Sequence, residues 1–195
     1  MAQLLARRRM TRSFDGTPVD SDWLDDLCAT ALWSPTAGNC AGVRMYTVGA
    51  ERVGAYFERA TDAEWRERAA RFEGLRRAGA VVVVTSRPQD YLDRYDESDK
   101  RASGLASRDA WRVPYWHTDA AMAAMSLLLL LEERGWSATL WGNFRHDGDV
   151  LAWIGAPDEA LFGSILIGRA DGGGVRPRSL DRDVPSRAAR VRRVD

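Results

Sequence analysis

One run of residues constrains the fold more than any other, the β-branched segment AVVVVT at residues 80–85. Apart from the closing threonine, it contains no polar residue. A half-buried strand alternates apolar and polar side chains, whereas a strand covered on both faces forms a continuous apolar run. The segment therefore predicts a strand that is buried on both faces.

Further elements are expected on both sides of this run. Apolar residues at helical spacing predict helices over residues 3–10, 21–33, 118–135 and 150–154. Residues 51–77 are also helical in period, with a break near Thr61 and Asp62. Asp20 or Ser21 is expected to cap the second helix, and Thr118 the long apolar one. Three more strands are expected over residues 43–48, 136–141 and 164–167.

Helices and strands alternate irregularly, which predicts an α+β fold, a mixed sheet flanked by helices. The 195 residues are 45% hydrophobic, enough for one core. We expect residues 1–180 to form a single domain and residues 181–195 a basic tail. Residues 86–114 are polar and rich in aspartate, and we interpret them as a lid or an insertion.

The charge of the chain is partitioned although its formal sum is zero, with 28 basic and 28 acidic residues. Residues 1–14 carry +4 and residues 176–195 carry +4, so residues 15–175 carry −8. A zero sum argues against a surface built as a whole for nucleic acid or an anionic membrane. Nucleic-acid binding by the Arg-rich tail alone stays an alternative.

Several other classes are excluded by pattern. The longest apolar stretch, residues 120–131, is shorter than the roughly 20 residues that span a bilayer, and no secretory signal is visible. Cys28 and Cys40 do not make a disulfide framework, so a cytoplasmic protein with free thiols is expected. His117 and His146 lack partners at zinc-ligand spacing, and we interpret His117 as an ordinary histidine at a helix start. The nucleophile-elbow, phosphate-loop and dinucleotide-binding patterns are absent from the sequence. If the chain is an enzyme, a cofactor is therefore expected to carry the chemistry.

The basic ends offer a phosphate site. Arg8, Arg9 and Arg12 can gather on the first helix and its exit, while Arg176 and Arg178 can point the same way from an extended segment. Guanidinium groups bind phosphate through two donors at once. On charge alone, solvated surface arginines remain the alternative.

Four segments, in order, resemble the FMN-dependent nitroreductase family. Residues 8–14 (RRMTRSF) look like its amino-terminal R-R-S-x-R-x-F motif, and residues 34–39 (SPTAGN) resemble its P-S-x-x-N loop. Residues 118–142 are similar to its long central helix and the segment beside the flavin. Residues 175–180 (VRPRSL) look like its carboxy-terminal phosphate-binding stretch.

The resemblance implies a homodimer with two FMN sites at the subunit interface, and hydride transfer from NADH or NADPH through flavin N5 to a small acceptor such as a nitroaromatic or a quinone. The implied phosphate and pyrimidine contacts are Arg8, Arg9, Met10, Arg12, Arg176 and Arg178. Pro35, Thr36, Ala37 and Asn39 would come from the other subunit. Leu140, Trp141, Gly142 and Asn143 would line the ring near N5. For an aromatic wall the candidates are Trp141, Phe144, Trp111, Tyr115 and Trp116, with an ordinary core role as the alternative for each.

The chain also departs from the family pattern. Met10 stands where serine is usual, so a side-chain hydrogen bond to the cofactor is in question. Ala41-Gly42-Val43 replaces the common Q-P-W, and residues 86–114 align with nothing in the family. A protein of this fold that holds a flavin without turnover is therefore an alternative. A deazaflavin in place of FMN, and a tail that wraps onto the partner subunit, also stay open.

Overall fold

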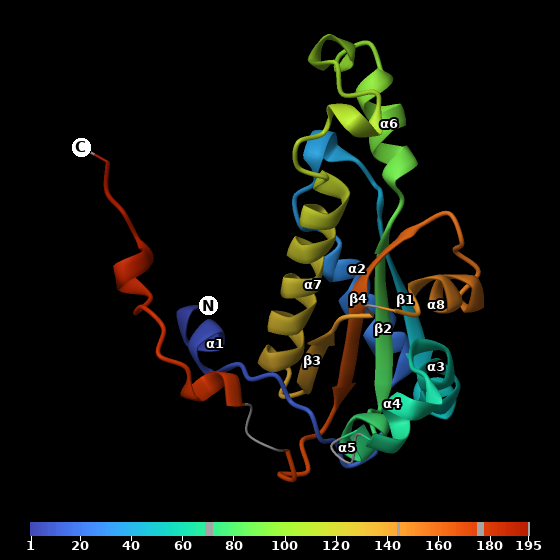
Figure 1. Cartoon of the computed structure of the whole chain (residues 1–195), viewed down its shortest axis with the longest axis vertical. Coiled ribbons are helices and arrows are strands. Elements are labelled where there is room, and N and C mark those ends of the chain that lie inside the picture. The colour runs from blue at the N-terminus through green and yellow to red at the C-terminus, as the bar shows by residue number, and fades with distance from the viewer. Residues whose placement is uncertain (69–71, 144, 175–177, 195) are drawn as a thin grey trace.

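The computed structural model describes residues 1–68, 72–143, 145–174 and 178–194 and is built around a four-stranded sheet (Figure 1). Its strands are β1 (Val43–Gly49), β2 (Ala80–Ser86), β3 (Ser137–Trp141) and β4 (Ala160–Gly168), in the order β1-β2-β4-β3. The three pairings between these strands are antiparallel. An isolated parallel bridge joins Met10 to Ala138 outside the named strands. The predicted α+β class and its four strands are confirmed.

β2 is buried along its whole length, as its apolar run predicts. Successive side chains of a strand point to opposite faces of the sheet. Accordingly Val82 and Val84 belong to one core cluster, whereas Val81 and Val83 belong to another. A core on each face explains why this strand carries no polar alternation.

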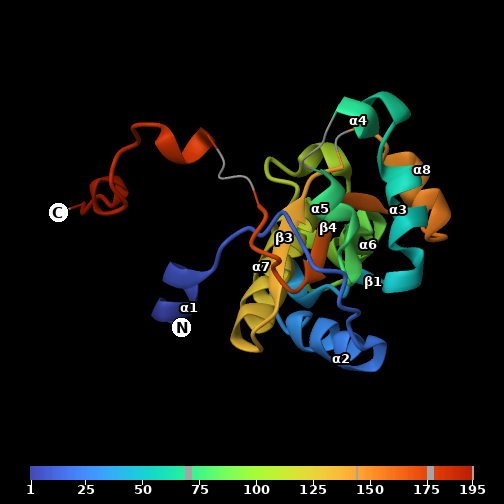
Figure 2. The same ribbon diagram turned by 90° about the horizontal axis from the view of Figure 1, so that it is seen from below.

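Helices cover both faces of the sheet (Figures 1 and 2). On one face lie α2 (Ser21–Ala31) and α7 (Tyr115–Glu133), whose apolar residues share a cluster with Val82. On the other face α3 (Val53–Ala60), α5 (Phe72–Arg76) and α8 (Asp147–Trp153) contribute to the second cluster. The expected break in the helical segment falls between α3 and α4 (Ala63–Arg68), where the Asp62 carboxylate accepts a hydrogen bond from the Trp65 backbone N–H.

The polar segment that follows β2 is ordered around α6 (Pro88–Asp96). Tyr91 and Leu92 of this helix form a third core cluster with Trp111, Trp116 and Cys40. Trp111 and Trp116 are thus core aromatics, whereas Tyr115 is exposed. Phe144 lies outside the described residues.

Helix boundaries differ from the sequence prediction at several ends. Asp20 caps α2 as expected, with its carboxylate accepting a hydrogen bond from the Trp23 N–H at 2.8 Å. Thr118 does not cap α7, because the helix begins three residues earlier, after Pro114, and the Thr118 hydroxyl donates to the Tyr115 carbonyl. The first helix, α1 (Ala2–Arg7), ends before Arg8, so Arg8 and Arg9 belong to its exit. None of the described helices is long and apolar enough to cross a membrane.

The packing of α7 on the sheet can be tested with Leu127, which is fully buried in the cluster shared with β2. Replacing Leu127 by Ala should lower the free energy of unfolding by about 2–5 kcal/mol, because the change removes buried methyl groups and leaves a cavity. The exposed Val113, replaced by Ala, should change it by less than about 0.5 kcal/mol. Urea denaturation measures both values. Equal losses in the two variants would contradict the assignment of α7 to the core.

Candidate functional site

The exit of α1 lies against the free edge of β3. The Thr11 N–H donates to the Ala138 carbonyl at 3.0 Å, next to the bridge between Met10 and Ala138. Two residues further along the strand, the Leu140 N–H donates to the Met10 thioether sulfur at 3.4 Å. The fold therefore brings together two segments that the sequence singled out, residues 8–12 and residues 140–143. Met10 uses its side chain to hold the β3 backbone.

The arginines at this exit have different surroundings. Arg9 is exposed, and its Nη1 donates to the carbonyls of Ala6 and Arg7 at 2.8 and 2.9 Å, which closes the end of α1. Arg12 is exposed, and its Nη1 lies 3.4 Å from the Met10 carbonyl oxygen. In Arg8, by contrast, Nε and Nη1 are buried and have no hydrogen-bond partner in the described part of the chain. Buried donors of a cation without an acceptor are costly, so Arg8 has the unmet bonding capacity that an anion would satisfy.

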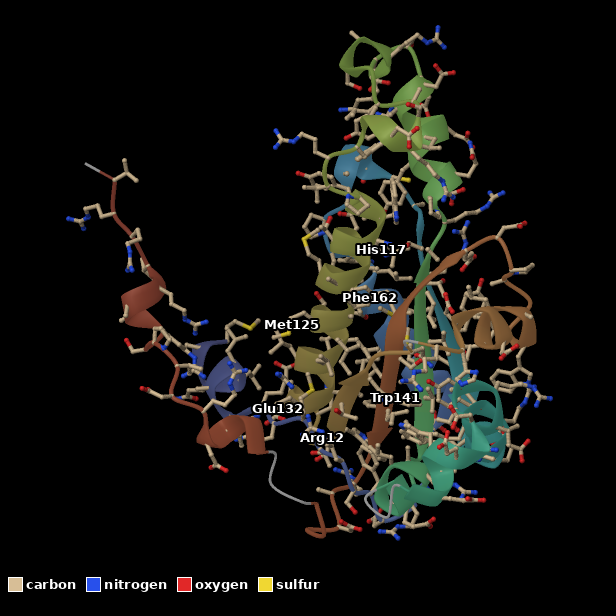
Figure 3. The ribbon with its side chains drawn as sticks, viewed as in Figure 1. Arg12, His117, Met125, Glu132, Trp141 and Phe162 are labelled. Atoms are coloured by element: carbon tan, nitrogen blue, oxygen red, sulfur yellow. The ribbon has the colours of Figure 1, made fainter. Side chains whose placement is uncertain are left out.

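The carboxy-terminal arginines add no described contact to this group. Arg176 lies outside the described residues, and the side chain of Arg178 is not described. Both chain ends extend from the same side of the molecule, beside the edge strand β3 (Figures 1 and 2). Arg12, Glu132 and Met125 lie on this side of the body (Figure 3).

The segment after β3 is held mainly through its side chains. The Asn143 amide donates to the Tyr56 hydroxyl at 3.1 Å and accepts from the Ser164 hydroxyl at 3.0 Å. The Trp141 ring packs against Phe57 of α3 and Trp65 of α4, with ring centroids 5.5 and 5.7 Å apart. These contacts fix residues 141–143 and turn both side chains toward protein partners.

A cavity of about 280 Å³ opens beside this segment. It is lined by Ala60, Thr61, Asp62, Trp65, Trp141, Gly142, Arg145 and His146. Within it, His146 Nε2 lies 3.7 Å from the Asp62 carboxylate. The hydrogen bond from the Trp65 N–H, followed by His146, lowers the pKa of Asp62. Asp62 and Trp65 are not among the candidate site residues expected from the sequence. Their pattern indicates only a helix start, with Asp62 as its cap. His117, near the start of α7, is half-buried, and burial lowers its pKa (Figure 3).

The predicted loop, residues 34–39, runs along α7 from Ser126, whose hydroxyl lies 2.7 Å from that of Ser34, toward the amino end of the helix. Its Ala37 N–H donates to the buried Asp119 carboxylate at 2.8 Å, near the amino end of the helix. Arg7, next to Arg8, pairs with Glu132 at 3.0 Å near the carboxyl end. Thirteen residues of helix separate these contacts, or about 20 Å at 1.5 Å per residue. In the described part of one chain, the loop is hydrogen-bonded to α6 and α7, and none of these bonds involves the Arg8 segment.

Within the loop, Pro35 and Asn39 are exposed, and Thr36 and Ala37 are partly exposed. Trp33, just before the loop, is 91% exposed. The described side chains form no cluster of His, Cys, Asp and Glu that could hold a metal ion.

Comparisons with known proteins agree with this architecture. The sequence profile of the Nitroreductase family matches residues 5–169. The fold is similar to that of the nitroreductase CinD from Lactococcus lactis in complex with chloramphenicol, with 17% identity, a TM-score of 0.70, and 95% of this chain and 99% of that chain covered. It is also similar to CLA-ER, an enone reductase of gut-bacterial fatty acid saturation, with 18% identity, a TM-score of 0.69, and 95% and 97% coverage.

A third similar structure is a Staphylococcus epidermidis protein assigned by name to the NAD(P)H:FMN oxidoreductases, with 17% identity, a TM-score of 0.66, and 94% and 95% coverage. No curated protein sequence matches the chain. The profile covers most of the chain, and its elements are those described above. The chain therefore belongs to the nitroreductase family.

Proposed function

We propose that this oxidoreductase-family protein is an FMN-dependent enzyme that passes electrons from a reduced nicotinamide to a small organic acceptor, such as a nitroaromatic or a quinone. The observation that carries the proposal is Arg8, whose Nε and Nη1 are buried without a hydrogen-bond partner in the described part of the chain, two residues before the bridge from Met10 to β3. Family membership and the name of the S. epidermidis structure support a flavin at this position.

The residues at the exit of α1 fit the phosphate of FMN. A guanidinium bonds a phosphate through two donors, and Arg8 has two buried donors without a partner. Arg9 and Arg12 add positive charge close to it in the chain. Arg176 and Arg178 are the further phosphate contacts that we propose from the opposite end of the chain.

The segment from Leu140 to Asn143 is proposed to lie along the flavin ring. The side chains of Trp141 and Asn143 are engaged with protein groups, and the Leu140 N–H donates to the Met10 sulfur, so the backbone of Gly142 and Asn143 is what this segment has to offer. When bound, FMN supplies the redox chemistry by taking a hydride from the nicotinamide and passing electrons to the acceptor. The neighbouring cavity shares Trp141 and Gly142 with this segment, and its aromatic wall favours a planar organic acceptor.

A second copy of the chain is proposed to complete each site. The 20 Å between the two ends of α7 keeps Pro35, Thr36, Ala37 and Asn39 away from the Arg8 of their own chain. The loop begins beside Trp33, which is 91% exposed, and Met122 of α7 and Leu5 of α1 are exposed apolar residues as well. An exposed tryptophan of this kind is typical of a surface that binds another protein.

The first test of the proposal is the cofactor. Purified protein, or protein incubated with FMN, should show the visible absorption of a bound flavin and should oxidise NADH or NADPH in the presence of a quinone or nitroaromatic acceptor. Absorption spectroscopy and a nicotinamide oxidation assay measure the two properties. Protein that takes up no FMN contradicts the proposal, and bound FMN that no nicotinamide reduces indicates a flavin-holding protein in place of an enzyme.

Replacement of Arg8 by Ala tests the phosphate contact. Charge-assisted hydrogen bonds are worth about 1.5–3 kcal/mol each, so the Kd for FMN should rise roughly 10- to 150-fold. The melting temperature of the flavin-free variant should not fall, because the lost guanidinium had buried donors without a partner. Arg101, exposed and remote in the α6 segment, provides the charge-matched control as R101A. FMN fluorescence titration measures the affinity, and an unchanged Kd in R8A would rule out the contact.

The proposed association of two copies is tested by replacing Trp33. Sedimentation equilibrium of the wild-type protein should give twice the 21.7 kDa mass of the chain. Trp33→Glu should shift the protein toward the monomer and weaken FMN binding in parallel, because a charge would be buried in the proposed interface. A monomeric wild-type protein that binds FMN tightly would disprove the shared site.

A further inference from the structure

We infer that Asp119 is a positioning residue which, together with Tyr91 and Arg94 of α6, holds the loop at residues 34–39 in the shape needed to contact the flavin of a second copy. The inference rests on the proposed function and extends it. It gives a role to Asp119 and to the polar segment after β2, neither of which touches the proposed phosphate site of its own chain.

The Asp119 carboxylate is 1% exposed, so its contacts are with protein groups. Its Oδ2 accepts one hydrogen bond from the Ala37 backbone N–H at 2.8 Å and another from the Tyr91 hydroxyl at 3.0 Å. Burial, and next the Asp119 charge, raises the pKa of Tyr91, which keeps this hydroxyl protonated as a donor. Hydrogen bonds to a carboxylate are stronger than those between neutral groups, so this pair is a firm anchor for the loop.

A residue of α6 makes a second hydrogen bond to the loop. Arg94 Nε donates to the Gly38 carbonyl at 2.9 Å, while its Nη1 pairs with Asp99 at 2.7 Å. Gly38 has φ +66°, and a Cβ at this position would lie 2.9 Å from the Tyr95 ring. The loop is therefore held through the N–H of Ala37 and the carbonyl of Gly38. A side chain larger than glycine at position 38 would force the Tyr95 ring to move.

These hydrogen bonds are made to the loop backbone and leave other groups of the loop exposed. Pro35 and Asn39 are exposed, and Asn39 adopts a left-handed conformation with φ 54°. A loop that is fixed before it binds loses less conformational entropy on binding. Asp119 should therefore raise the affinity for FMN without any contact with FMN.

The aromatic cluster beneath the loop supports the same unit. Tyr91 packs edge-on against Trp111 and Trp116, with ring centroids 6.3 Å apart in both pairs. Gly42 lies under the Tyr91 ring, and a Cβ there would come within 2.4 Å of it. The lack of a side chain at Gly42 therefore makes room for Tyr91 to reach Asp119.

The test compares four variants for loop protection and FMN affinity. Asp119→Ala removes both hydrogen bonds, Asp119→Asn keeps an oxygen for the Ala37 N–H, and Tyr91→Phe removes only the hydroxyl bond. Val81→Ala, in the core on the opposite face of the sheet, is the control for a general loss of stability. Hydrogen exchange of the peptide around Ala37 is measured on flavin-free protein, and FMN affinity by fluorescence titration.

Asp119→Ala should accelerate exchange at Ala37 and raise the Kd for FMN, each at least about tenfold, and Asp119→Asn should restore most of both. Val81→Ala should lower the melting temperature and change neither property. If Asp119→Ala does not fold, Tyr91→Phe should still show a smaller change of the same sign. Unchanged exchange or unchanged Kd in the folded variants overturns the inference alone, whereas wild-type protein that binds no FMN overturns the proposed function and the flavin role of the loop together.

Discussion

The arrangement of the molecule depends on the packing of α7 against the buried strand β2. β2 places Val82 and Val84 on the face that α7 covers, and the helix is fixed there by its row of buried leucines and alanines. Because α7 is a rigid element, it sets the distance between what is attached to its two ends. One end holds the loop through Asp119, and the other pairs through Glu132 with Arg7, the last residue of α1. The separation between these two attachment points follows from the length of this helix.

Sequence reasoning identified the elements whose signal is local. The AVVVVT run, the cap at Asp20 and the break at residues 61–62 each depend on neighbouring residues and were predicted correctly. Boundaries set by tertiary contacts were not. The start of β4 was placed at Ser164, whereas its pairing with the end of β2 extends the strand back to Ala160. The α7 cap at Thr118 was wrong, because the helix begins at Tyr115 after Pro114, and Trp116 of its first turn packs in the aromatic cluster.

For the candidate site, the sequence offers segments but not their contacts. Charge and motif order singled out Arg8 and residues 140–143, and the fold brings these two segments together at β3. The hydrogen bond to the Met10 sulfur and the buried, unpartnered donors of Arg8 depend on tertiary packing. They therefore cannot be predicted from the local sequence. The role of Asp119 is not visible in the sequence, because its link to Ala37 joins positions 82 residues apart.

The segment after α1 has one more consequence, which concerns association with other chains. β3 ends the sheet, and an edge strand exposes backbone groups that can template pairing with a foreign strand. Here the Ala138 carbonyl accepts a hydrogen bond from the Thr11 N–H, and the Leu140 N–H donates one to the Met10 sulfur. A short, irregular piece of chain thus blocks the edge without becoming a strand itself. The residues that place Arg8 beside the sheet therefore also guard the protein against aggregation along β3.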